Sequence, residues 1–233
     1  MQVTKKLVGL GDSIMKGVLM VQEENGKVCY SLSDQNIVDR VGASMHADVL
    51  NLGKMGCTVE AGERVLNRYI EQLREAEYVL LCFGGNDSDY NWSEIADNHN
   101  QKYSAKTILN VFEKTYTRIV NTIKEAGCSP IILSLPPMNA QKYFDFFTGN
   151  FSAEQKKNVL TWLRGSVDTI WAGHELYNDA VKRVAAMTDS LLVDVTTPLG
   201  DGAHFLCDDG IHPNQRGQEL IAQIIKRNLP CQK

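Results

Sequence analysis

Near its N-terminus the chain reads Lys6-Leu7-Val8-Gly9-Leu10-Gly11-Asp12-Ser13-Ile14. The apolar residues of this run predict a buried strand, and Gly11 and Asp12 predict that the strand ends in a turn. Ser13 then stands where the chain turns. In an open α/β sheet the reacting groups gather at the carboxyl ends of the strands, so Ser13 is a candidate nucleophile. Taken alone the run proves little, because Gly-Asp-Ser is also ordinary turn chemistry.

The length of the chain, 233 residues, and its 43% hydrophobic content predict a full core without disulfide staples. We expect a single domain over residues 1–233. The net charge of -4 and the lack of a run of Lys and Arg argue against nucleic acid as a partner. Residues 7–10 are too short an apolar run for a signal peptide, and no other stretch is long enough to span a membrane.

The six cysteines are widely spaced along the chain and form no Cys-x-x-Cys pair, so zinc or a redox couple is not expected. They are Cys29, Cys57, Cys82, Cys128, Cys207 and Cys231. Separate thiols, several of them in strand-like apolar runs, favour a reducing, cytoplasmic setting.

Apolar runs alternate with amphipathic stretches, a pattern typical of parallel βαβ units. The predicted strands are Lys5 to Leu10, Asp48 to Leu52, Tyr78 to Phe83, Pro130 to Leu135 and Leu191 to Val195. The predicted helices are Asp34 to Met45, Val59 to Glu75, Ala105 to Ala126, Ala153 to Met187 with a break near Gly173, and Asn214 to Lys226. Three loops are expected at the carboxyl side of strands, as binding loops or simple surface loops: Lys16 to Ser33, Ser88 to Ser104 and Pro136 to Asn150.

The carboxyl ends of four strands carry groups with complementary chemistry. The first delivers Ser13, the second leads to Gly56, the third ends in Gly84-Gly85-Asn86-Asp87, and the fifth leads to Asp209-Gly210-Ile211-His212-Pro213-Asn214. A hydroxyl, a base, a carboxylate that orients the base, and donors for an oxyanion are the requirements of acyl transfer. Each group alone has a plain structural role as a turn or cap residue, and their coincidence at successive strand ends favours a catalytic site.

The sequence resembles the GDSL/SGNH hydrolase family. The four sequence blocks of that family match, in order and over nearly the whole chain, residues 11–14, 51–58, 84–87 and 209–214. The resemblance implies an α/β fold, a three-layer α/β/α sandwich around a flavodoxin-like five-stranded parallel sheet in the order 2-1-3-4-5. It also implies an esterase or acylhydrolase that needs no cofactor and no metal.

Carried over residue by residue, the resemblance implies that Ser13 is the nucleophile, His212 the base and Asp209 the residue that orients the base. The oxyanion hole would consist of the backbone N–H groups of Ser13 and Gly56 and the side-chain amide of Asn86. Asp12 is then not needed as the carboxylate, and we expect it to brace the turn through backbone N–H groups.

A second Asp-x-x-His pair, Asp201 and His204, leaves an internal alternative. We favour Asp209 and His212, because Pro213 and Asn214 open an amphipathic helix directly after them. His204 is expected in a loop.

The run of residues 87–92 and the loop after the fourth strand supply candidates for the substrate wall: Tyr90, Trp92 and Met138. Asp87 and Asp89 lack a third acid or a histidine nearby, which argues against a metal site. His46 and His174 lie in helical stretches and are expected to be surface or packing residues. Cys57, beside Gly56, is a candidate for thiol sensitivity.

The main alternative class is a flavodoxin-like or dinucleotide-binding module without catalysis. Ile14 stands at the last glycine of the phosphate-binding pattern, and Asp12 would repel a pyrophosphate, so this reading is disfavoured. Within the enzyme class we expect a small-molecule carboxylic ester with a small acyl group, with acetylated sugars included. Lysophospholipid and thioester hydrolysis are alternatives, and the sequence leaves the oligomeric state open.

Overall fold

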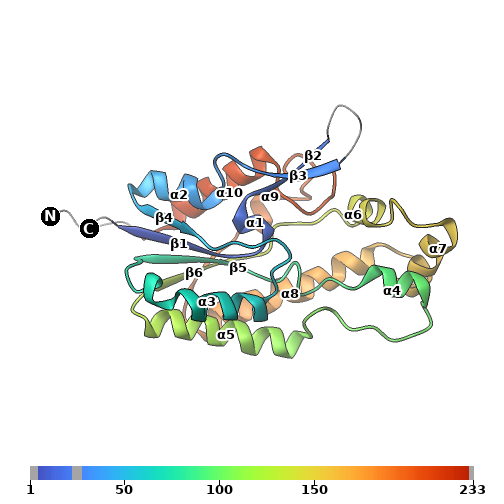
Figure 1. Cartoon of the computed structure of the whole chain (residues 1–233), viewed down its shortest axis with the longest axis horizontal. Helices are drawn as coiled ribbons and strands as arrows, with labels where there is room; N and C mark the ends of the chain where they lie inside the picture. The colour runs from blue at the N-terminus through green and yellow to red at the C-terminus, as the bar shows by residue number, and fades with distance from the viewer. Residues whose placement is uncertain (1–4, 23–27, 231–233) are drawn as a thin grey trace.

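The structure, a computed structural model, describes residues 5–22 and 28–230 of the chain. Its centre is a sheet of five parallel strands (Figure 1). Across the sheet the strands are β4 (Asp48–Asn51), β1 (Lys6–Gly11), β5 (Tyr78–Cys82), β6 (Ser129–Leu133) and β7 (Leu191–Val193). They are the five predicted strands, so the order 2-1-3-4-5 is confirmed.

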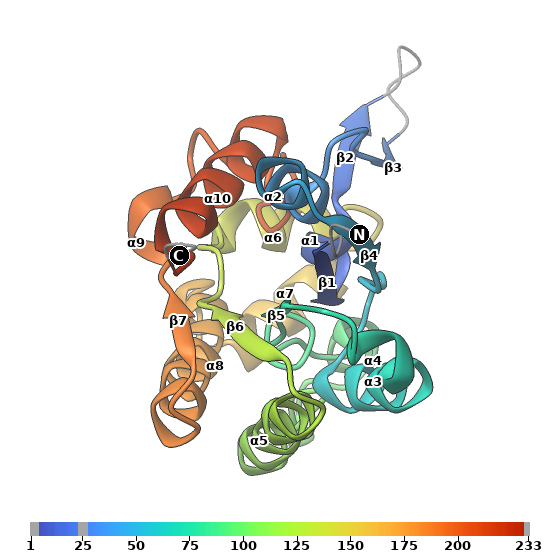
Figure 2. The ribbon, with the colours of Figure 1, turned by 90° about the vertical axis from the view of Figure 1, so that its left-hand side faces the viewer.

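Helices cover both faces of this sheet (Figure 2). One face carries α2 (Ile37–Met45), α9 (Thr196–Leu199) and α10 (Gln215–Asn228), and the other carries α3 (Val59–Leu73), α5 (Leu109–Glu125) and α8 (Asp168–Met187). Side chains of the central strand β5 alternate between the two layers, because successive residues of a strand point to opposite faces. Val79 and Leu81 pack toward α3 and α5, whereas Leu80 and Cys82 pack toward α2 and α10. The three-layer α/β/α sandwich is confirmed.

One helix boundary differs clearly from the prediction. The break in the long helical stretch falls at residues 163–167, between α7 (Ala153–Trp162) and α8, and the predicted break near Gly173 is wrong. Arg164 and Gly165 both adopt left-handed backbone conformations there, which end a helix. Gly173 lies inside α8, where a glycine lowers helix stability by about 1 kcal/mol without forcing a break.

The three segments expected to be loops contain secondary structure. Residues 16–33 include the antiparallel hairpin of β2 (Val18–Gln22) and β3 (Val28–Leu32), which follows the short helix α1 (Ser13–Lys16). Residues 88–104 include α4 (Trp92–Asp97), and residues 136–150 include α6 (Ala140–Phe147). These helices are short, and their apolar residues pack on each other, so the pattern of each segment alone does not reveal them.

Helices α4, α6 and α7 form a separate layer beyond the carboxyl ends of the strands (Figure 1). We call these three helices the helical cap. They share a hydrophobic cluster of their own with the start of α8, built around the buried residues Trp92, Ile95, Phe144, Val159 and Leu163. The cap therefore faces the edge of the sheet at which the predicted site residues gather.

None of the helices among the described residues has the length and apolar character that crossing a membrane requires. Cys57, Cys82, Cys128 and Cys207 are free thiols, in agreement with the expected separate cysteines. Cys231 lies outside the described residues.

Candidate active site

Ser13 lies at the first residue of α1, immediately after β1, and its side chain is buried. Asp12 caps this short helix, because its Oδ1 accepts a hydrogen bond of 2.9 Å from the N–H of Ile14. Gly11 is required just before the turn, since a Cβ there would stand 2.5 Å from the carbonyl oxygen of Cys82 on β5. Strand β1 and the tight turn that follows it thus fix the position of the Ser13 hydroxyl.

Ser13, His212 and Asp209 form a continuous hydrogen-bonded chain. Nε2 of His212 lies 2.9 Å from Oγ of Ser13, and Nδ1 of His212 lies 2.6 Å from Oδ2 of Asp209. The other carboxylate oxygen of Asp209 accepts from the backbone N–H groups of Ile211 and His212, both at 3.0 Å. This is the arrangement in which an imidazole takes a proton from a hydroxyl while a carboxylate fixes its tautomer.

Asp209 is fully buried, yet it stays ionised. Burial opposes the charge, but the hydrogen bond and the positive field of His212, together with the two backbone N–H groups, hold the pKa of Asp209 below its ordinary value. A carboxylate in this state stabilises the protonated imidazole that forms when His212 accepts a proton.

The loop that carries Asp209 and His212 is tied down at several points. The N–H of Cys207 donates to the carbonyl of His212 at 2.8 Å, and the N–H of Asn139 donates to the carbonyl of Gly210 at 2.8 Å. Gly210 has a left-handed backbone, and a Cβ there would lie 2.6 Å from the carbonyl oxygen of Asn139. Asn214 then caps α10, as the sequence predicts for the start of that helix.

The alternative pair lies apart from this site. His204 is exposed and does not line the cavity next to Ser13. Asp201 accepts a hydrogen bond from the N–H of Ala203 within its own turn. The geometry favours Asp209 and His212 for this reason.

Gly56 and Asn86 line the same cavity as Ser13, so the three predicted oxyanion donors are brought together. Gly56 has a left-handed backbone and open space where a side chain would lie. Nδ2 of Asn86 donates a hydrogen bond of 3.1 Å to Oδ2 of Asp12. Asn86 is therefore oriented by the residue next to Ser13, a link that the sequence pattern did not reveal.

Asp12 is buried with both carboxylate oxygens in use, one on the N–H of Ile14 and one on Asn86. Burial raises the pKa of Asp12 to about 6, although the two hydrogen bonds and the nearby His212 oppose the rise. The expected role as a brace of the turn agrees with these contacts.

Asp87 and Asp89 have structural partners. Both oxygens of Asp87 lie within 3.2 Å of the N–H of Val59, at the start of α3. Asp89 accepts from the indole of Trp92 at 2.8 Å, from the hydroxyl of Tyr143 at 2.9 Å and from Lys106 at 2.7 Å. Within residues 5–22 and 28–230, no group of three His, Cys, Asp or Glu side chains is arranged to hold a metal ion.

The cavity beside Ser13 has a volume of about 280 Å³ and is walled mainly by apolar and aromatic side chains. The expected wall residues Tyr90, Trp92 and Met138 all line it. Two further lining residues are Tyr30, from β3, and His174, from α8. The ring of Tyr30 stands edge-on to the ring of His212, with centroids 5.3 Å apart.

His174 corrects one expectation. It is 9% exposed and lines the cavity, so it is neither a surface residue nor a simple packing residue. The available signal is its spacing from Ile170, one helical turn earlier, which also lines the cavity. His46, in contrast, is the exposed C-cap of α2, as expected.

Cys57 is buried next to Gly56 and does not line the cavity. Burial and the nearby carboxylates Asp12 and Asp87 raise the pKa of its thiol to about 11. A thiol in this state is mostly protonated at neutral pH, which argues against thiol sensitivity at this position.

The fold and the site geometry define an α/β protein with a serine, histidine and aspartate in hydrogen-bond contact at the carboxyl end of its sheet. The model of the GDSL-like lipase/acylhydrolase family matches residues 10–220. The chain belongs to that family. No curated protein sequence matches it significantly.

Solved structures with the same fold include enzymes from two sources. LAE5, an alpha/beta hydrolase enzyme from the metagenome of Lake Arreo in Spain, has a TM-score of 0.64 and 21% identity over 96% of this chain and 94% of its own. Axe2, an acetylxylan esterase from Geobacillus stearothermophilus, has a TM-score of 0.62 and 20% identity over 100% of this chain and 98% of its own. These likenesses show the fold.

Proposed function

We propose that the protein is a serine esterase that cleaves carboxylic esters through an acyl-enzyme at Ser13. The observation that carries the proposal is the hydrogen-bonded chain from Ser13 Oγ through His212 to Asp209. Membership of an acylhydrolase family supports it. A binding module without catalysis has no comparable support, because a flavodoxin-like fold by itself does not require this chain of contacts.

In the first half-reaction Oγ of Ser13 attacks the ester carbonyl carbon while Nε2 of His212 accepts the hydroxyl proton. The carbonyl oxygen becomes an oxyanion, which the N–H groups of Ser13 and Gly56 and the amide of Asn86 receive. The tetrahedral intermediate then collapses, its C–O bond to the alcohol breaks, and His212 donates the proton to the departing alcohol. A water molecule repeats the sequence on the acyl-enzyme and releases the acid.

Asp12 contributes to this scheme through Asn86. Its carboxylate accepts from Nδ2 of Asn86 and so restricts the rotation of the amide. A donor that is already oriented needs no rearrangement when the oxyanion forms, which is the basis of its effect on the barrier.

For the substrate we propose a small acyl ester, with acetylated sugars as one class. The cavity of about 280 Å³ lies just below the ~300–1,000 Å³ range of ligand pockets, which favours a small substrate over a long-chain lysophospholipid. A neighbour in fold, Axe2, is an acetylxylan esterase. A thioester with a short acyl group remains the second candidate, since the same nucleophile attacks it.

The experiment that tests the proposal is a panel of p-nitrophenyl esters of rising chain length, assayed beside acetylated sugars and a short-chain thioester. We expect the highest kcat/KM for short acyl chains and none for Ser13→Ala. Equal activity of Ser13→Ala would contradict the mechanism. Labelling with a fluorophosphonate, mapped by mass spectrometry, identifies the activated serine independently of any substrate. A cytoplasmic setting, consistent with the free thiols, stays a prediction that cell fractionation tests.

A further inference from the structure

The cavity beside Ser13 is lined by a polar side chain, His174, that the proposed mechanism does not use. His174 lies on α8 with its side chain about nine-tenths buried. Across the described part of the chain, its buried Nδ1 has no hydrogen-bond partner. Oε1 of Glu175 lies 3.6 Å from this Nδ1, which is an ion-pair distance, and the contact with His174 lowers the pKa of Glu175.

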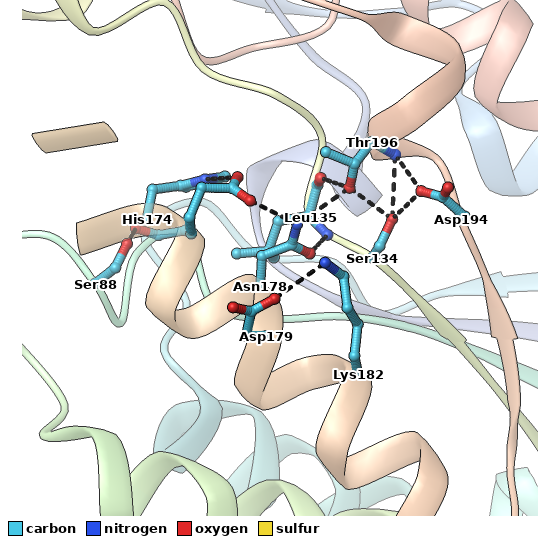
Figure 3. Close-up of polar contacts among 11 residues, drawn as sticks. Ser88, Ser134, Leu135, His174, Asn178, Asp179, Lys182, Asp194 and Thr196 are labelled. Atoms are coloured by element: carbon cyan, nitrogen blue, oxygen red, sulfur yellow. Dashed lines mark hydrogen bonds and ion pairs between the residues drawn. The ribbon is translucent and has the colours of Figure 1, made fainter. Parts of the chain in front are cut away.

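The neighbouring polar residues differ from His174 in this respect. Asn178, one turn further along α8, is held by the N–H of Leu135 and the hydroxyl of Thr196 (Figure 3). Ser88, which also lines the cavity, donates its hydroxyl to the carbonyl of Gly85 at 3.1 Å. Asp89 is occupied by Trp92, Tyr143 and Lys106. His174 is thus a polar side chain of this wall whose buried Nδ1 has hydrogen-bonding capacity left over.

Aromatic side chains, among them Tyr90, Trp92 and Phe147, line the same cavity as His174. Trp92 is stacked on Phe147 at 4.5 Å between ring centroids, and Tyr90 packs edge-on to Trp162. Flat aromatic side chains pack well against the faces of ring-shaped groups. A buried imidazole nitrogen without a hydrogen bond costs free energy until a donor or acceptor pairs with it. A neutral imidazole has one donor and one acceptor nitrogen, so a hydroxyl group satisfies it in either tautomer.

We propose that His174 is a specificity-determining residue that binds a hydroxyl group of the substrate, on a ring that lies against the aromatic wall. This inference rests on the proposed esterase function and narrows its substrate class to hydroxylated ring esters. A sugar ring and a hydroxyaryl ring share this chemistry. The hydroxyl belongs to either the acyl or the alcohol part of the ester, and the assays below separate these cases.

The test uses pairs of ring esters in which one member carries free hydroxyl groups and the other carries none. For the alcohol part the pairs are 4-hydroxyphenyl acetate against 4-methylphenyl acetate, and acetylated xylose against cyclohexyl acetate. For the acyl part the pair is the p-nitrophenyl ester of 4-hydroxyphenylacetic acid against that of 4-methylphenylacetic acid. We expect the wild type to prefer the hydroxylated member of at least one pair by about tenfold in kcat/KM, mainly through KM.

His174→Leu should abolish that preference while kcat on the methyl or cyclohexyl member changes little. His174→Asn, which keeps a polar atom near Nδ1, should retain part of it. His204→Leu, at an exposed loop position, is the matched control and should retain all of it. A wild type with no preference in any pair, or a His174→Leu variant that keeps the full preference, would overturn the inference.

A binding measurement separates this inference from the proposed mechanism. Calorimetric titration of Ser13→Ala needs no turnover. The ligands are the free acids 4-hydroxyphenylacetic acid and 4-methylphenylacetic acid, and the free alcohols xylose and cyclohexanol. Tighter binding of a hydroxylated member, lost on adding His174→Leu, supports the role of His174 even if Ser13 proves not to be the nucleophile. Equal binding of both members of each pair contradicts that role even if Ser13 is the nucleophile. Thermal unfolding of each variant verifies that it is folded.

Discussion

The carboxyl end of the sheet and the helical cap form opposite walls of one cavity, and they are held by different forces. At the sheet edge the backbone fixes the side chains. Asp12 caps α1, and Gly11 allows close contact with β5. Gly210 allows the loop of His212 to pack closely against the backbone of Asn139. In the cap, aromatic packing and the contacts of Asp89 fix the wall. Backbone constraints place atoms within narrow limits, whereas packed rings tolerate exchange of one apolar side chain for another. We therefore expect the sheet edge to control the rate and the cap to control the choice of substrate.

The largest expected effect is at the base. His212→Ala removes the proton acceptor of Ser13 and should lower kcat by about 10⁴-fold or more, because members of a triad act as a unit. His204→Ala, in the second Asp-x-x-His, should leave kcat within about twofold, since an exposed side chain outside the cavity does not act on the chemistry. Steady-state kinetics on a p-nitrophenyl ester measure both. The reverse result would mean that the assignment of the base is wrong.

The next effect is at the oxyanion hole. Asn86→Ala should lower kcat by about 10²- to 10³-fold, the usual cost of one lost oxyanion donor, with KM little changed. The variant should stay folded but melt at a lower temperature, because the buried Oδ2 of Asp12 loses the hydrogen bond that Asn86 donates. A rise in KM with kcat unchanged would assign Asn86 to substrate binding instead.

A stability effect follows from Asp87. Burial raises the pKa of Asp87 from 3.8 to about 6, so the folded protein binds this proton more tightly than the unfolded chain does. The stability that the protonated group contributes is complete below pH 3.8 and is lost as the pH rises to about 6. Asp87→Asn removes this titrating group. Between about pH 4 and about pH 7.5 the free energy of unfolding should therefore fall less in the variant than in the wild type, by up to about 3 kcal/mol.

Urea unfolding at the two pH values measures this change. Asp208→Asn is the control, because Asp208 is exposed and forms an ion pair with Lys142 on the surface. If Asp87→Asn loses as much stability as the wild type between the two pH values, the proton on Asp87 does not contribute.

The smallest effect is expected in the cap. Asp89→Ala releases the Trp92 indole and the Tyr143 hydroxyl, so the aromatic wall loosens. KM should rise about fivefold, the equivalent of about one hydrogen bond, while kcat stays nearly constant. Asp145→Ala, on the same cap but with an exposed side chain bonded only to Gln141, should change neither. A fall of kcat comparable to that of Asn86→Ala would remove the distinction between the two walls.

The sheet edge was more predictable from the sequence than the cap. Each strand is a largely apolar run, and Ser13, Gly56 and Asn86 follow such runs within a few positions, so local patterns place these three residues at one edge. The same patterns do not place Tyr30 or His174. Tyr30 reaches His212 through a hairpin whose residues alternate between exposed and half-buried, and such a segment looks like a loop.

The sequence pattern did not predict the cap helices α4 and α6 for a related reason. Trp92 on α4 meets Phe147 on α6 and Trp162 on α7, from three segments far apart in the sequence. Their apolar character is explained by contacts that no single segment contains. The link between Asp12 and Asn86 is likewise non-local, since 74 positions separate the two residues.

The hydrogen bond between Ser13 and His212 joins residues 199 positions apart, one just after the first strand and the other just before the last helix. During synthesis the proposed nucleophile and oxyanion donors emerge well before the proposed base does. A nascent or prematurely terminated chain that ends before residue 209 carries Ser13 without a proton acceptor and should not hydrolyse esters. Under the proposed mechanism, turnover of an ester therefore reports that synthesis has passed residue 212 and that the first strand and the last helix have come together.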